Sequence, residues 1–269
     1  MLKGDILETF IRVLKDVKPN NPILIEGLPG IGNIGRIVAG YLIEELETEK
    51  IAELYSPHFL PFVILHEDVA RVLKCEFHYY KDPKGKNDLI ILIGDSQSGD
   101  QEGYGHYEIA EKILDYAEDL GVKKVFTIGG FGTGEIEKDE PMVLGAVNDP
   151  KLLEEYKGYG INFEETSLKL GMIVGATGLL LGLSKLRGMD GLCLLGETAG
   201  FPILTDPKAG EAVLKILMKI LNLDISLEKL EKRVKDMENF LQKIERIQQQ
   251  ALKQMGQEKS DEDELRYIG

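Results

Sequence analysis

The sequence predicts an α/β fold, a three-layer α/β/α sandwich with a mostly parallel central sheet, followed by a long C-terminal helix and a mobile tail. Two observations lead to this class. Through residues 1–223, short runs of β-branched residues and leucine alternate with helical patterns, and each run leads into a turn that contains glycine. The runs are continuously apolar, which is typical of strands covered by helices on both faces.

Five segments carry this combination of apolar run, glycine turn and helical or loop sequence. Parallel strands place their carboxyl-terminal loops on one rim of a sheet, where ligands and partners usually bind. We therefore expect the five glycine turns to line a common rim, and the run at 74–81 to add an extra strand or edge hairpin. In chain order, the five segments are PILIEG at 22–27, DLIILIGDSQSGD at 88–100, KKVFTIGGFGTGE at 123–135, GMIVGATGLLLGLSKL at 171–186 and GLCLLGETAGFPI at 191–203.

Residues 224–255 are expected to form one amphipathic helix, because the segment 226–255 contains no glycine or proline. Its apolar residues are spaced three and four apart, as in a heptad seam of fewer than three heptads. This favours a helix that packs on its own domain or on a sister subunit, over one that binds an external helix. The seam consists of Leu227, Leu230, Val234, Met237, Leu241 and Ile244.

The last segment, 256–269, combines an acidic spacer with a small apolar tip. The spacer is strongly polar, so it is expected to stay mobile. A mobile spacer that carries an apolar tip suits a peptide that docks on a partner, and the alternative is a frayed end without a binding role. The residues of the tip that would bind are Leu265, Tyr267, Ile268 and Gly269.

Charge and hydropathy exclude two classes of partner. The formal net charge is −14 at pH 7, so the surface repels nucleic acid and anionic membranes. The longest apolar stretch, 171–183, is too short to cross a bilayer, and the N-terminal segment holds acids where a signal peptide needs an apolar run. We therefore expect a cytoplasmic protein in which Cys75 and Cys193 are buried, reduced thiols.

Residues 30–35 fit the dinucleotide-binding fingerprint G-x-G-x-x-G, and Glu53 lies roughly where such folds place a ribose-binding acid. Pro29 weakens the match, because proline fixes its own φ and lacks an amide donor. Carboxylates expected at the rim also oppose a phosphate, since a like-charge contact near 4 Å costs about 4 kcal/mol. A nucleotide would therefore need Mg²⁺. These carboxylates are Glu26, Asp95, Asp100, Glu102, Glu135 and Glu197, with Arg36 as the nearby cation.

No pattern for covalent or metal catalysis occurs in the sequence. The G-x-S-x-G elbow is absent, Asp100 stands where a phosphate loop needs lysine, and the histidines lack zinc-binding spacing. His106 is the best candidate for an acid or base. We expect no catalytic residue, metal or cofactor, and a rim suited to protein contact through glycines and exposed apolar residues. Those apolar residues are Leu28, Ile31, Phe131 and Phe201.

The order and spacing of the glycine turns resemble those of the PAC2 family, the archaeal homologues of proteasome assembly chaperones. The resemblance covers roughly residues 22–223 and rests on GLPGIGNIG, IGGFGTGE, GATGLLLGL and GETAGFP. It implies an α/β sandwich that self-associates, for example as a tetramer or pentamer, and acts without catalysis. The resemblance also implies that the protein assists assembly of the proteasome α-ring or docks on that ring. The glycine loop of the family motif corresponds to Gly27, Pro29, Gly30, Gly32 and Gly35.

Some members of this family resemble proteasome activators in ending with a hydrophobic residue, a tyrosine and one further residue. The resemblance implies that such a tail inserts between neighbouring α-subunits, where its carboxylate meets a lysine. Here Tyr267 stands one position earlier than that motif, because two residues follow it. Two alternatives stay open: an Mg-dependent nucleotide-binding enzyme that uses the glycine loop, and a structural subunit of a complex unrelated to the proteasome.

Overall fold

The computed structural model describes residues 8–134, 140–164, 171–200 and 205–236. The chain divides into two compact units, Met1–Ser226 and Leu227–Gly269. Within the described part of the second unit, residues 228–236 are helical. Leu230 and Val234 are buried there, whereas the charged residues between them are exposed. Leu227, the first residue of the expected seam, precedes this helix and is partly buried; Met237, Leu241, Ile244 and the whole tip 265–269 lie outside the described residues.

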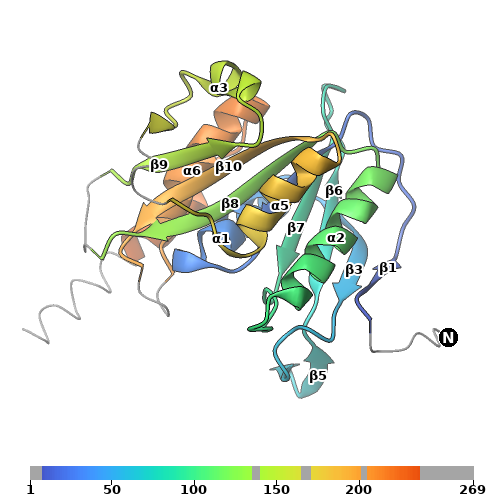
Figure 1. The fold of residues 1–269 in the computed structure, drawn as a ribbon. Helices are drawn as coiled ribbons and strands as arrows, with labels where there is room; N and C mark the ends of the chain where they lie inside the picture. The colour runs from blue at the N-terminus through green and yellow to red at the C-terminus, as the bar shows by residue number, and fades with distance from the viewer. Residues whose placement is uncertain (1–7, 135–139, 165–170, 201–204, 237–269) are drawn as a thin grey trace, which may run out of the picture. The chain divides into compact units, whose positions relative to one another are not determined.

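A mixed sheet forms the middle layer of the first unit and contains eight strands among the described residues (Figure 1). These strands are β1 (Phe10–Val13), β2 (Ile23–Gly27), β3 (Glu49–Tyr55), β6 (Cys75–Tyr80), β7 (Leu89–Gly94), β8 (Lys124–Gly132), β9 (Val143–Val147) and β10 (Asp190–Thr198). Their order across the sheet is β1-β3-β6-β7-β2-β8-β10-β9. The neighbours β7, β2, β8 and β10 are parallel, and the strands on either side join antiparallel.

The predicted α/β sandwich is confirmed, with a mixed sheet: β7, β2, β8 and β10 are joined by three parallel pairings, and the other four pairings are antiparallel. These four strands are four of the five predicted apolar runs that precede glycine turns, whereas the fifth run, at 171–174, does not form a strand and leads directly into α5. The run at 74–81 does form an additional strand, β6, but β6 lies inside the sheet between β3 and β7 and is not an edge hairpin. A separate two-stranded sheet consists of β4 (Val63–His66) and β5 (Val69–Val72).

Helices form the two outer layers (Figure 1). On one face, α1 (Ile34–Glu45) contacts β2, β7 and β8, and α6 (Pro207–Leu221) contacts β9 and β10. On the other face, α2 (Tyr104–Asp119) packs beside α5 (Gly175–Leu186), which contacts β8 and β10. The short helix α3 (Lys151–Tyr156) follows β9. No helix in the described parts of the chain is both long and apolar enough to cross a membrane.

Local sequence explains where α6 begins and ends. The Asp206 side chain accepts a hydrogen bond from the Ala209 amide at 2.9 Å, and Pro207 occupies the first turn, where a missing amide hydrogen costs nothing. Asn222 ends the helix in the left-handed conformation, with φ 52°.

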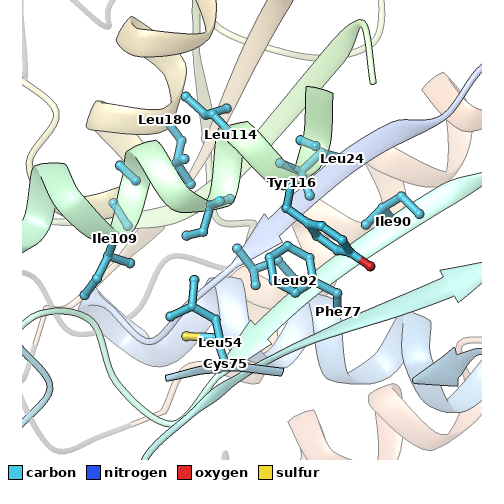
Figure 2. Close-up of a cluster of buried hydrophobic side chains, with 14 of the residues drawn as sticks. Leu24, Leu54, Cys75, Phe77, Ile90, Leu92, Ile109, Leu114, Tyr116 and Leu180 are labelled. Atoms are coloured by element: carbon cyan, nitrogen blue, oxygen red, sulfur yellow. The ribbon is translucent and has the colours of Figure 1, made fainter. Parts of the chain in front are cut away.

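One extensive cluster of core side chains lies beneath α2 and α5. Figure 2 shows apolar residues of the sheet facing residues of both helices. The rings of Phe77 on β6 and Tyr116 on α2 meet edge to face, with centroids 4.9 Å apart. Cys75 belongs to this cluster, and it and Cys193 are free and buried, as the sequence predicts.

Candidate functional site

The glycine loop between β2 and α1 brings the helix unusually close to the sheet. A Cβ atom on Gly35 would lie 2.5 Å from the carbonyl oxygen of Ile128 on β8, and one on Gly27 would collide with the carbonyl oxygen of Gly35. A Cβ on Gly130 of β8 would likewise collide with the carbonyl oxygen of Ile31. These glycines therefore provide the space in which α1 packs on the backbone of β2 and β8.

The middle of the loop turns through two successive left-handed residues, Gly32 with φ 63° and Asn33 with φ 55°. The Gly32 carbonyl accepts a hydrogen bond from the Asp206 amide at 2.8 Å, so the turn is tied to the start of α6. A Cβ on Gly32 would lie 3.1 Å from Thr198 Oγ1, at the end of β10. The loop thus fits against protein on the side where a dinucleotide fold brings its second glycine close to a pyrophosphate.

Gln97 connects two of the glycine turns. Its Nε2 donates to the Pro29 carbonyl at 2.6 Å, and its Oε1 accepts from the Ala176 amide at 2.9 Å. The first turn of α5 thereby receives a side-chain acceptor from the loop after β7. Helix N-termini are common anion sites because their amides are unpaired, and here one of those amides is already satisfied by the protein. The sequence did not single out Gln97, because its partners lie 68 and 79 residues away.

Glu26, Asp95 and Glu197 are buried or ion-paired, which corrects the sequence-based prediction for these three rim carboxylates, whereas Glu102 is exposed as expected. Asp95 makes two bonds to Arg71, at 2.5 and 3.0 Å, and these lower its pKa although its burial alone would raise it. Asp100 accepts from the amides of Glu102 at 2.9 Å and Gly105 at 2.7 Å, next to the start of α2. Buried Glu197 accepts from the Met142 amide at 3.0 Å. Glu135 lies outside the described residues.

Glu26 departs furthest from that expectation, because it lies in the core. Its side chain is 0 % exposed, and its Oε1 accepts from the Leu28 amide at 2.8 Å. Burial raises the pKa of Glu26 to about 7, and hydrogen bonds from Leu28, Ile128 and Thr177 offset only part of that effect. The carboxyl group therefore holds its proton to a higher pH than an exposed glutamate does.

Two of the apolar rim residues were also placed wrongly by the sequence. Leu28 and Phe131 are buried, at 1 % and 3 % exposure, because each side chain points from its loop or strand end into the core. Ile31 is 44 % exposed, as expected, and Phe201 lies outside the described residues.

Glu53 does not lie beside the glycine loop, because β6 and β7 separate β3 from β2. Lys74 Nζ is 2.5 Å from Glu53 Oε1, and the Tyr55 hydroxyl donates to Oε2 at 3.0 Å. Burial opposes ionisation, but the bonds to Lys74, Lys50 and Tyr55 outweigh it and lower the pKa of Glu53 to about 2. The position that suggested a ribose-binding acid is therefore part of an ion-pair network on the sheet.

The comparison with known families decides the identity of this fold. The model of the PAC2 family matches residues 24–245. The chain belongs to the PAC2 family. The resemblance of its glycine turns to that family is thus confirmed.

Relatives of this PAC2 protein extend over nearly its whole length. The uncharacterized protein MJ1210 of Methanocaldococcus jannaschii is 38% identical over 266 residues, which is 98% of this chain and 99% of that protein. Among solved structures, Pyrococcus furiosus PbaB, described as an archaeal proteasome activator, is 44% identical with a TM-score of 0.83 and covers 88% of this chain and 99% of its own. Pyrococcus furiosus PbaA, described as an archaeal homolog of proteasome-assembly chaperone, is 30% identical with a TM-score of 0.68, covering 88% and 96%.

A contact between His58 and Glu108 in this PAC2 protein was not predicted from the sequence. His58 Nε2 lies 3.0 Å from Glu108 Oε2, and the Thr9 amide donates to Glu108 Oε1 at 2.8 Å. These contacts tie the N-terminal segment and the loop after β3 to α2. The predicted acid or base, His106, lies in the first turn of α2, partly buried. Within the described parts of the chain, no cluster of three histidine, cysteine or acidic side chains could hold a metal ion.

The ion-pair network of the PAC2 sheet leads to a stability prediction. In Lys74→Met, Glu53 and Glu76 lose the nearer of the two cations that they share, at 2.5 and 2.8 Å, and we expect the free energy of unfolding at pH 7 to fall by about 2 kcal/mol. The contribution of Glu53 is present above its ordinary pKa of 4.5 and is lost as pH falls toward about 2, so the deficit of the variant should shrink on acidification.

Urea unfolding at pH 7 and pH 3 measures this difference. The matched control is Lys15→Met, since the pair of Lys15 with Glu49 is about half exposed on both sides and should change stability by less than about 1 kcal/mol. Equal losses of unfolding free energy in the two variants at pH 7 would show that the buried ion pairs of Lys74 stabilise the fold no more than the exposed pair of Lys15 does.

Proposed function

We propose that this chain is a non-catalytic proteasome assembly chaperone or activator-like factor, which self-associates and binds proteasome α-subunits. The observation that carries the proposal is the likeness to PbaB, at 44% identity across 99% of that solved chain. The match to PbaA, at 30% identity, supports the same class of partner. The two relatives are described as activator and chaperone homologue, and the higher identity to PbaB favours the activator-like role.

The geometry of the rim supports a non-catalytic function. Space beside Gly32 is occupied by Thr198, an amide at the start of α5 is capped by Gln97, and Asp95 is held by Arg71. Because protein groups already occupy this space and these hydrogen-bonding positions, a structural role for the glycine loop is favoured over ligand binding. In this proposal Gly27, Pro29, Gly30, Gly32 and Gly35 set the shape of the body and hold no cofactor.

The second unit supplies the remaining contacts in this proposal. In this proposal the heptad seam of residues 227–244 packs on its own domain or on a sister subunit, as the spacing of its apolar residues favours. The acidic spacer gives several tips of one assembly the reach to occupy separate pockets of an α-ring. The docking residues would be Leu265, Tyr267, Ile268 and Gly269.

Deletion of residues 265–269 tests the proposal. We expect the deletion to weaken capture of purified α-rings at least about tenfold, equivalent to about 1.4 kcal/mol, because the docking groups are lost. The thermal unfolding midpoint should not change. Lys259→Ala in the spacer is the control and should bind as the full chain does. Binding at full strength after the deletion would remove the tip from the mechanism.

A pull-down from extract separates the proposed function from its competitors. With the full chain as bait, mass spectrometry is expected to find proteasome α-subunits. A stable complex without any proteasome subunit would contradict the proposed function, whatever the effect of the tail.

A further inference from the structure

The β4–β5 hairpin extends away from the main sheet, with β5 at the lower edge of the ribbon in Figure 1. Glu67 and Asp68 join its strands, and both are left-handed, with φ 47° and 63°. Two successive positive φ angles are the signature of a two-residue type I′ turn, which fixes the register of a hairpin. The pairs in that register are Val63 with Val72, Ile64 with Arg71, Leu65 with Ala70, and His66 with Val69.

The two faces of the hairpin have opposite character. On one face, Ile64 packs against the core cluster beneath α2 and α5, and Arg71 binds Asp95, so this face is anchored to the rest of the first unit. Because side chains alternate along a strand, the residues on either side of Ile64 and of Arg71 point in the opposite direction. We call this the outer hairpin face, and it consists of Val63, Leu65, Ala70 and Val72.

The outer hairpin face is apolar and exposed, the reverse of what a solvent-facing sheet normally shows. Leu65 is 71 % exposed, Val72 56 % and Val63 51 %. Leu60 and Phe62, just before β4, are exposed as well. Monomeric proteins rarely leave a contiguous apolar patch of this kind in water. Another surface should therefore cover it.

We propose that the outer hairpin face is a two-fold contact between two copies of this chain. The inference rests on the self-association that the proposed function includes, and it assigns that self-association to a surface. A chain with a net charge of −14 repels its own copies over most of its surface, so a contact between copies needs a face without carboxylates. The outer hairpin face carries no charged side chain, so placing it against itself opposes no like charges.

The size and the edges of the hairpin agree with this occupant. Leu60, Phe62, Val63, Leu65 and Val72 are each at least 43 % exposed, so a contact between two copies could remove ten large apolar side chains from water. Within the described residues, β4 and β5 pair only with each other, so each keeps one edge free of a strand neighbour. Two such edges can pair through their backbones across a two-fold axis.

The contact also constrains the number of subunits. A two-fold contact uses the same patch on both copies and closes on itself, so it adds copies in pairs. This contact alone gives a dimer; a tetramer needs a second contact surface, and a pentamer cannot be built by this contact alone.

Sedimentation equilibrium of the full chain tests the proposal. Leu65→Glu would place a carboxylate against its own copy, and we expect the dissociation constant of the assembly to rise at least about 100-fold. The control is Leu186→Glu, at the end of α5, where the leucine is 82 % exposed and the assembly should not change. Leu65 is largely exposed, so the variant subunit should unfold at the same temperature as the wild-type subunit does when diluted.

A second variant tests proximity directly. Leu65→Cys treated with a short bifunctional thiol reagent should give a covalent dimer, and Leu186→Cys should not; the buried Cys75 and Cys193 should not react. A wild-type chain that stays monomeric, or a Leu65→Glu chain that assembles normally, would overturn the proposal. If Leu65→Glu stays assembled but loses α-subunit capture, the face belongs to the proteasome contact and the proposal is wrong while the proposed function stands. Failure of every variant to capture α-subunits would instead count against the proposed function.

Discussion

Gly35→Ala is expected to lower the free energy of unfolding by about 3 kcal/mol. The added Cβ would lie 2.5 Å from the Ile128 carbonyl oxygen and 3.0 Å from that of Leu28, and both obstacles are backbone atoms. Relief of these contacts would require α1 to move away from the sheet, which opens space in the buried layer beneath the helix. Equilibrium urea unfolding measures the loss.

Gly30→Ala is the matched control from the same fingerprint. Gly30 is extended, with φ −161°, a conformation that alanine adopts readily. A Cβ there would have only Gln97 Nε2 nearby, at 3.7 Å. The control should change stability by less than about 1 kcal/mol. Similar losses in both variants would contradict the assignment of Gly35 to close packing.

This pair explains why the glycine pattern alone misleads. In a dinucleotide fold the third glycine serves helix packing and the second admits a pyrophosphate. This chain shares the packing demand at Gly35, so it shares the spacing, but the space beside Gly32 is occupied by Thr198. The fingerprint therefore indicates only a close strand–turn–helix connection. Whether a ligand can bind there depends on residues such as Thr198 on β10, which the pattern does not contain.

The parallel centre of the sheet was predictable because its signal is local. Each centre strand is a continuous apolar run beside a glycine turn, and no tertiary contact is needed to recognise it. The flanking strands were harder, since β3 and β6 carry charged residues on one face. Glu53 and Glu76 are register partners there, and they can be neighbours only because Lys74 and Lys50 lie between them.

The charges at the rim could not be assigned for the same reason. Asp95 meets Arg71 across 24 residues, and Glu197 meets Met142 across 55. Sequence shows that a carboxylate follows a strand, but only the fold shows whether a distant group satisfies it. The same limit applies to the apolar residues Leu28 and Phe131. Both were predicted to be exposed but are buried, because a position near a turn does not reveal the direction of its side chain.

Glu26→Gln is expected to stabilise the protein by about 3 kcal/mol at pH 8 and to have little effect near pH 4. Burial raises the pKa of Glu26 from 4.5 to about 7, so between these values the unfolded chain releases a proton that the folded chain retains. The stability of the wild-type protein is therefore fully present below pH 4.5 and falls as the pH rises through 7, by about 1.4 kcal/mol per unit for this group. Glutamine is neutral throughout and keeps an oxygen for the Leu28 amide.

Unfolding free energies measured from pH 4 to pH 8 decide this prediction, because the sign of the effect is unusual for a carboxyl group. An ion-paired glutamate such as Glu53 has the opposite dependence, so its removal should cost stability at pH 8. Glu49→Gln, at a half-exposed position on β3, is the control for the loss of a carboxyl group at the surface. A difference between Glu26→Gln and wild type that stays constant with pH would show that the carboxyl group is not held protonated. A difference that grows with pH would place a titrating proton directly behind the glycine loop, where its release weakens the fold without any ligand.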